Sequence, residues 1–321
     1  MSMLIYMFSL NGLTVVFYLF ASLASGNGLS LLPAGDSVNF RIAEIAGYCV
    51  SFLLTIFLMS RGITKYPGFT PAKRPYSLLT LPVFFAAFFV LGYVGMFFSY
   101  LFENIGIHGI DASLNAPKSG LNLLLFIVQY TFLPALLEEY LFRGVMLGRL
   151  RRFGDGFAVV LSSFIFALMH HNIVSMPNIF LLGALFGYIT LKSNSLIPSF
   201  IMHFLNNAIA IFATYIEQHN APISIDSLSL ILFFLGLLSG AAVIICLILR
   251  FAQRRRLRVE SPAFYAQNNF IPKRNQLALG AALKSGWMIT FFIIAVYLTL
   301  ILEFLPRFME RFADIAGGFS L

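Results

Sequence analysis

Nine apolar runs divide this chain, and each reaches or approaches the roughly 17 to 25 residues that a helix needs to cross a lipid bilayer. They cover residues 3–24, 43–60, 78–102, 121–147, 157–172, 177–192, 196–216, 227–250 and 286–305. Backbone groups in hydrocarbon have no water to bind, so such segments form helices. The sequence therefore predicts an all-α fold: a polytopic transmembrane helix bundle of about eight to nine membrane helices. We expect a single integral membrane domain over residues 1–321.

The composition supports this class of protein and excludes others. Apolar residues make up 59% of the chain and charged residues 11%, whereas soluble domains have about half and about a quarter. The formal charge of +8 would suit nucleic acid, but the basic residues gather between the apolar runs, as topology signals do. We therefore expect no nucleic-acid partner. Cys49 and Cys246 lie within apolar runs, where a free cysteine behaves as a small hydrophobic side chain.

The basic residues also predict an orientation. Segments rich in Lys and Arg, around residues 61–74, 149–152, 192 and 250–284, alternate with segments that hold few. Because basic loops stay in the cytoplasm, the N-terminus is expected to be cytoplasmic and the C-terminus to lie outside. The first run could instead be a signal peptide, since Ser22-Leu23-Ala24 resembles a cleavage site, but no Lys or Arg precedes it.

Two adjacent acids and an arginine interrupt the apolar run 121–147. An ionisable group at bilayer depth costs several kcal/mol unless it is paired or hydrated, so it suggests function. Glu139 and Arg143 are four residues apart and share a helical face, so they can pair. Glu138 points about 100° away and needs another partner. Pro134 has no amide to donate to the Tyr130 carbonyl, which loosens the helix one turn before the acids. A purely structural ion pair is the alternative interpretation.

Two further runs carry histidines at helical spacing. Phe166 and His170 are four residues apart, and so are His203 and Asn207. Each pair could simply pack or join helices by hydrogen bonds. Counted at 1.5 Å per residue from the nearest cytoplasmic end, however, Glu138, His170 and His203 lie at roughly 12 to 21 Å depth. Similar depth favours a single site over three unrelated polar positions.

The motifs Glu138-Glu139-x-x-x-Arg143, Phe166-x-x-x-His170 and His203-x-x-x-Asn207 occur in this order on successive membrane helices. Together they resemble the CAAX-processing and bacteriocin-processing (CPBP, or Abi) membrane endopeptidases, which include the Ras-converting CAAX endopeptidase of eukaryotes. The resemblance covers about residues 120–216, the expected catalytic core. It implies an intramembrane protease of the glutamate type, with no cofactor. It also implies an integral membrane protein, which we expect in a bacterial plasma membrane.

The resemblance implies the catalytic residues Glu138, Glu139, His170, His203 and Asn207, with Arg143 and Phe166 in support. In this scheme Glu138 and His170 hold and deprotonate the attacking water, while His203 and Asn207 donate hydrogen bonds to the oxyanion. The second acid and its arginine would orient the first acid. Peptide hydrolysis needs a positioned base and preorganised donors, so the residue types suit the reaction.

Three alternatives remain open on the sequence. Two Glu, two His and an Asn could hold zinc, although no His-Glu-x-x-His motif is present. Buried Glu, His and Arg would also suit a proton-linked transporter, but related halves are not evident. A catalytically silent scaffold or bacteriocin-immunity protein of the same fold is the third. The expected partners are the lipid bilayer and a peptide or membrane-protein substrate, whose identity the sequence does not indicate.

Overall fold

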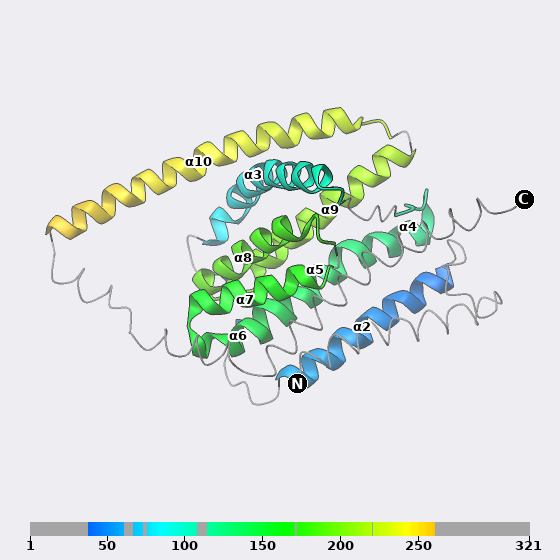
Figure 1. Ribbon diagram of the computed structural model, residues 1–321, viewed down its shortest axis with the longest axis horizontal. Coiled ribbons are helices and arrows are strands. Elements are labelled where there is room, and N and C mark those ends of the chain that lie inside the picture. Colours follow the sequence, from blue (N-terminus) through cyan, green and yellow to red (C-terminus); the bar gives the residue numbers. More distant parts are fainter. Residues whose placement is uncertain are drawn as a thin grey trace, which may run out of the picture.

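The structure, a computed structural model, describes residues 38–60, 67–72, 76–107, 114–170, 172–219 and 221–260. Every regular element in these ranges is a helix (Figure 1). The elements are α2 (Val38–Ser60), α3 (Tyr76–Asn104), α4 (Gly120–Ile127), η1 (Val128–Phe132), α5 (Leu133–Glu138), η2 (Glu139–Met146), α6 (Leu147–Leu150), η3 (Arg151–Phe153), α7 (Asp155–Leu168), α8 (Met176–Ser193), α9 (Ile197–His219) and α10 (Ile225–Glu260). The predicted all-α class is confirmed for the described residues.

Five of the described segments are long and apolar enough to cross a membrane. They are Arg41–Ser60, Tyr76–Asn104, Gly120–Phe153, Ile197–His219 and Ile225–Leu249. α7 is apolar but shorter, with 14 residues. The predicted runs 3–24 and 286–305 lie outside the described residues. The total of eight to nine spans and the cytoplasmic N-terminus therefore stay predictions.

The segment from Gly120 to Phe153 is one continuous helical path that contains two π-helical stretches and ends in a 3-10 turn. The π-helical stretches η1 and η2 lie before and after α5, and in such stretches the amide bonds to the carbonyl five residues back. The amide of Leu133 donates to Val128 in this way, next to Pro134, which has no amide to continue the α-helical pattern. The sequence predicted a loosened helix before the acids. It gave no sign of η2, which begins at Glu139.

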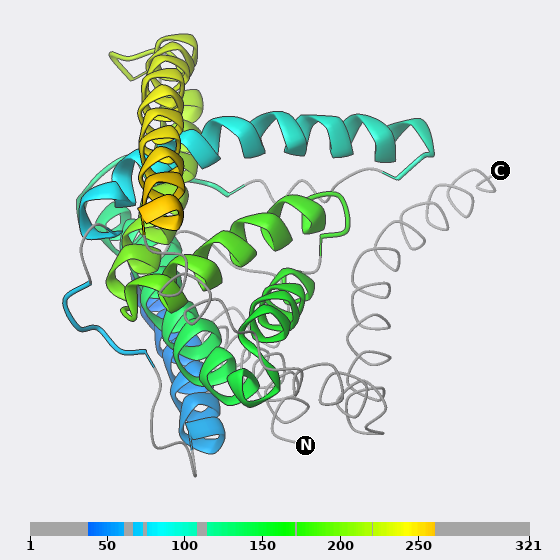
Figure 2. The same cartoon turned by 90° about the vertical axis from the view of Figure 1, so that its left-hand side faces the viewer.

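The segment 120–153 lies between two groups of helices. α2 packs along it on one side, whereas α3 and α10 lie beyond α8 and α9 on the other, as the two views agree (Figures 1 and 2). Its second half is the most deeply buried stretch, with Leu141, Phe142, Val145, Met146 and Leu147 almost fully buried. Arg143 is the largest fully buried side chain among the described residues. A charge at the centre of the core therefore requires partners.

Candidate active site

The centre of the candidate site is a buried ion pair that a histidine joins from another helix. Nη1 of Arg143 donates to Oε1 of Glu139 at 2.7 Å, and neither side chain is exposed. Nδ1 of His203, on α9, lies 2.9 Å from the same carboxylate oxygen. An ionised carboxylate only accepts hydrogen bonds, so Nδ1 of His203 carries the proton of this contact. The pair that the spacing predicts is present, and it also binds η2 to α9.

Arg143 is enclosed by aromatic rings and by a glycine. Its guanidinium carbon lies 4.2 Å from the ring centre of Phe166 and 5.4 Å from that of Phe186. Nη2 donates to the carbonyl of Gly183, on α8, at 3.3 Å. A Cβ at position 183 would approach this nitrogen and the Phe166 ring to 3.1 Å. A larger residue at position 183 would therefore crowd the guanidinium group. The Phe166 ring is a cation–π partner of Arg143.

Glu138, the last residue of α5, takes its hydrogen bond from a helix that Glu139 does not contact by hydrogen bonds. Its Oε1 accepts a hydrogen bond from the Tyr48 hydroxyl, on α2, at 2.8 Å. Its Oε2 lies 3.8 Å from Nε2 of His203 and is buried without a hydrogen bond from any described residue. The family resemblance of the motifs implied that Glu139 and Arg143 orient this acid. In the structure Glu139 and Arg143 bind each other, Glu139 also contacts His203, and the hydrogen bond to Glu138 comes from Tyr48.

His170 lies just beyond the end of α7, one turn after Phe166. α7 ends at Leu168, whereas the apolar run continues to residue 172. Nδ1 of His170 contacts the Phe166 carbonyl at 2.9 Å, and because a carbonyl only accepts, this nitrogen is protonated and Nε2 keeps its lone pair. The two rings meet edge to face at 4.8 Å. His170 is exposed and close enough to Glu138 to interact with it electrostatically.

Asn207 lies one turn after His203 on α9 and is half-buried. Its Oδ1 accepts a hydrogen bond from Nδ2 of Asn206 at 3.3 Å. Since the oxygen is engaged, the amide nitrogen of Asn207 is left to donate elsewhere. The structure therefore brings Glu138, Glu139, Arg143 and His203 together, with Phe166 and His170 against them. Asn207 shares the helix of His203 and is linked to Asn206.

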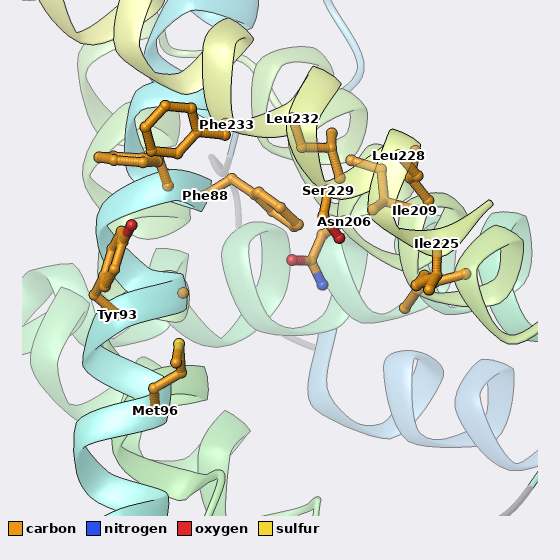
Figure 3. A pocket seen from close by; sticks show the side chains of 14 residues that line it. Phe88, Tyr93, Met96, Asn206, Ile209, Ile225, Leu228, Ser229, Leu232 and Phe233 are labelled. Carbon is orange, nitrogen blue, oxygen red and sulfur yellow. The ribbon is translucent and has the colours of Figure 1, made fainter. Parts of the chain in front are cut away.

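An apolar groove of about 550 Å³ includes Asn206 in its lining (Figure 3). It lies between α3, α9 and α10. Its apolar lining includes Phe88, Met96, Ile209, Leu228 and Phe233 (Figure 3). Asn206 is a polar group on its wall (Figure 3). The groove thus reaches the residue that hydrogen-bonds to Asn207, and its lining suits an apolar ligand with a few polar groups at one end.

The described residues do not contain a metal-binding cluster. No group of three or more His, Cys, Asp and Glu side chains in the part of the chain that the structure describes is arranged to hold a metal ion. His203 already uses Nδ1 on Glu139, and His170 uses Nδ1 on a backbone carbonyl. Such second partners are also common for zinc-binding histidines, so metal independence stays a prediction.

Sequence reasoning missed three residues of the site. Tyr48 lies on a helix outside the motif segment, and its hydroxyl gives no periodic signal among apolar neighbours. Gly183 matters because it has no side chain where Arg143 packs against α8. Nothing in the sequence around it indicates that close approach. Phe186, which packs against both Arg143 and His203, resembles any other core aromatic. All three depend on contacts between helices, which spacing within one helix cannot predict.

The comparisons with known proteins agree with the motif segment. Residues 120–209 match the family model described as type II CAAX prenyl endopeptidase Rce1-like. The comparisons with curated proteins and with solved structures give no match. The matched segment contains all of the residues of the motifs and ends just after Asn207. Over residues 120–209 the chain is therefore similar to the CAAX-type membrane proteases that this family model describes, which supports the CPBP resemblance of the motifs.

Proposed function

We propose that this protein is an intramembrane endopeptidase in which Glu138 and His170 activate a water molecule. The observation that carries the proposal is the free oxygen of Glu138: Oε2 is buried, makes no hydrogen bond to any described residue and faces Nε2 of His203 at 3.8 Å. A buried carboxylate oxygen without a hydrogen bond is costly unless water or a substrate group occupies it. The attacking water is a suitable occupant.

In this mechanism the base has two parts. Glu138 accepts a proton from water through Oε2, while Nε2 of His170, whose lone pair is free, accepts a second hydrogen bond from the same water. The water oxygen attacks the scissile carbonyl carbon, and the C–N bond then breaks. The proton taken by Glu138 passes to the leaving amine, so the base ends the cycle ionised as it began.

His203 and Asn207 are proposed to stabilise the oxyanion. Nδ1 of His203 is engaged by Glu139, so its Nε2 donates a hydrogen bond only when the ring is an imidazolium. In that form the ring would lie beside both carboxylates, 2.9 Å from Oε1 of Glu139 and 3.8 Å from Oε2 of Glu138. Asn207 would donate from its amide nitrogen. Preorganised donors of this kind typically contribute about 3 to 4 kcal/mol to catalysis.

The groove beside Asn206 is proposed to receive an apolar part of the substrate. The family model's description names prenyl endopeptidases, whose substrates carry a prenyl group on the cysteine of a C-terminal CAAX sequence. The groove is mostly apolar, and α9 carries both its wall residue Asn206 and the proposed oxyanion residues. A lipid chain or an apolar peptide segment held there would lie near the reacting bond. Metal is not part of this mechanism.

The experiment is a cleavage assay on the full-length protein in lipid vesicles. Peptides that end in a CAAX sequence, with and without a prenylated cysteine, and an apolar transmembrane peptide are incubated with the wild type and with Glu138→Ala. Mass spectrometry identifies new termini. We expect a defined cleavage with the wild type that is lost with the variant. Cleavage that persists in Glu138→Ala would refute the proposed mechanism.

A further inference from the structure

Tyr48 makes the hydrogen bond that holds Glu138. Its hydroxyl lies 2.8 Å from Oε1 of Glu138, and the two residues are on different helices, 90 positions apart in sequence. An ionised carboxylate accepts only, so the phenol is the donor. Hydrogen bonds to a charged group are stronger than those between neutral groups. Tyr48 thus binds one of the two carboxylate oxygens, and the other is the one left free.

The helix that carries Tyr48 is fixed in register against the segment 120–153. Arg41 lies seven residues before Tyr48, on the same face of α2, and its Nε donates to Oδ1 of Asn122 at 2.6 Å. Phe52, one turn after Tyr48, is almost fully buried, and its ring packs 4.6 Å from that of Tyr48. These contacts lie on either side of Tyr48 along α2. They hold α2 in place against the segment 120–153, so the Tyr48 hydroxyl stays beside Glu138.

We propose that Tyr48 is a positioning residue that orients Glu138 for water activation. It holds Oε1 in place, so that Oε2 is directed at the water and at His203. α2 lies outside residues 120–209, where the family model matches, so the catalytic unit includes a helix that the motifs do not indicate. The inference rests on the proposed function. Tyr48 acts through Glu138 and touches no reacting atom.

The test uses Tyr48→Phe, which removes only the hydroxyl group. Its kcat and KM are measured in the vesicle assay with the peptide that the wild type cleaves. Without its donor, the carboxylate samples orientations that do not face the water, and kcat is expected to fall about tenfold while KM is unchanged. Tyr100→Phe, at an exposed tyrosine of α3, is the matched control and should keep the kcat of the wild type. Thermal unfolding of Tyr100→Phe should match the wild type, and Tyr48→Phe should unfold only a few degrees lower, so both variants are folded in the assay.

Repeating the Tyr48→Phe substitution in a Glu138→Asp variant distinguishes a positioning role of Tyr48 from a packing role. In Glu138→Asp the shorter acid no longer reaches Tyr48, so adding Tyr48→Phe should lower kcat less than twofold further. An equal loss in both backgrounds, a change in KM alone, or an unchanged kcat in Tyr48→Phe would overturn the inference. If Glu138→Ala itself keeps its activity, the proposed function fails. If Glu138→Ala is inactive and Tyr48→Phe is fully active, only the role of Tyr48 fails.

Discussion

Nδ1 of His203 lies 2.9 Å from Oε1 of Glu139, although 64 residues separate them in sequence. The same oxygen accepts a hydrogen bond from Arg143 at 2.7 Å. Glu139 is therefore the group through which the arginine on η2 and the histidine on α9 are held together. In the proposed mechanism Glu139 orients His203, and Oε2 of Glu138, which has no hydrogen bond to a described residue, accepts the proton of the water.

Glu139→Gln should be strongly destabilising. The variant leaves the fully buried Arg143 without a counter-charge, and removing one member of a buried pair typically costs about 3 to 5 kcal/mol. Chemical unfolding in mixed micelles measures this loss. Glu103→Gln, at an exposed glutamate near the end of α3, is the control and should change the unfolding free energy by less than about 0.5 kcal/mol. Equal stability of the two variants would contradict the account of the ion pair.

Gly183→Ala should impair activity more than Gly187→Ala does. A Cβ at position 183 meets Nη2 of Arg143 and the Phe166 ring at 3.1 Å, whereas a Cβ at 187 meets the end of the Leu147 side chain at 3.3 Å. The first requires Arg143 or the Phe166 ring to move by a few tenths of an ångström, at the ion pair that fixes His203, and catalytic rates are sensitive to small misplacements. The second gains helix propensity of about 1 kcal/mol. Rates and unfolding curves of both variants, measured side by side, check the prediction; similar rates would refute it.

The order of the helices and the main polar cluster could be predicted from the sequence, because apolar length and spacing of four are local properties. The Glu139–Arg143 pair is an example. The end of α7 could not be predicted, because it depends on the contact of the His170 ring with the Phe166 carbonyl. The π-helical winding that begins at Glu139 likewise has no signal in the spacing of the residues. The contact of Glu138 with Tyr48 depends on how α2 docks, which no periodicity in the chain encodes.

Asn207→Ala should lower kcat about 100-fold to 1000-fold, because an oxyanion donor acts only in the transition state. Asn206→Ala is the matched comparison on the neighbouring position. It removes a polar group from the wall of the groove and a hydrogen bond to Asn207, so it should raise KM and lower kcat less. Steady-state kinetics of both variants in vesicles test this. A larger loss of kcat in Asn206→Ala would reverse the assignment of the two amides.

Exhaustive chelation should leave the cleavage rate unchanged. The proposed base is a carboxylate with a histidine, and the proposed electrophile is an imidazolium, so no step requires a metal. The purified protein is treated with EDTA and phenanthroline, dialysed against metal-free buffer and assayed, with metal content measured by mass spectrometry. Activity that disappears on chelation and returns with added zinc would establish the metal mechanism that the sequence left open.

The most direct test of the central claim is the cleavage rate of Glu138→Gln. Glutamine keeps the shape of the side chain and an oxygen that can accept from Tyr48, but it cannot take a proton from water. We predict a kcat about 100-fold to 10,000-fold below that of the wild type, with KM unchanged and the unfolding curve intact. A kcat within twofold of the wild type would contradict the claim that Glu138 is the base.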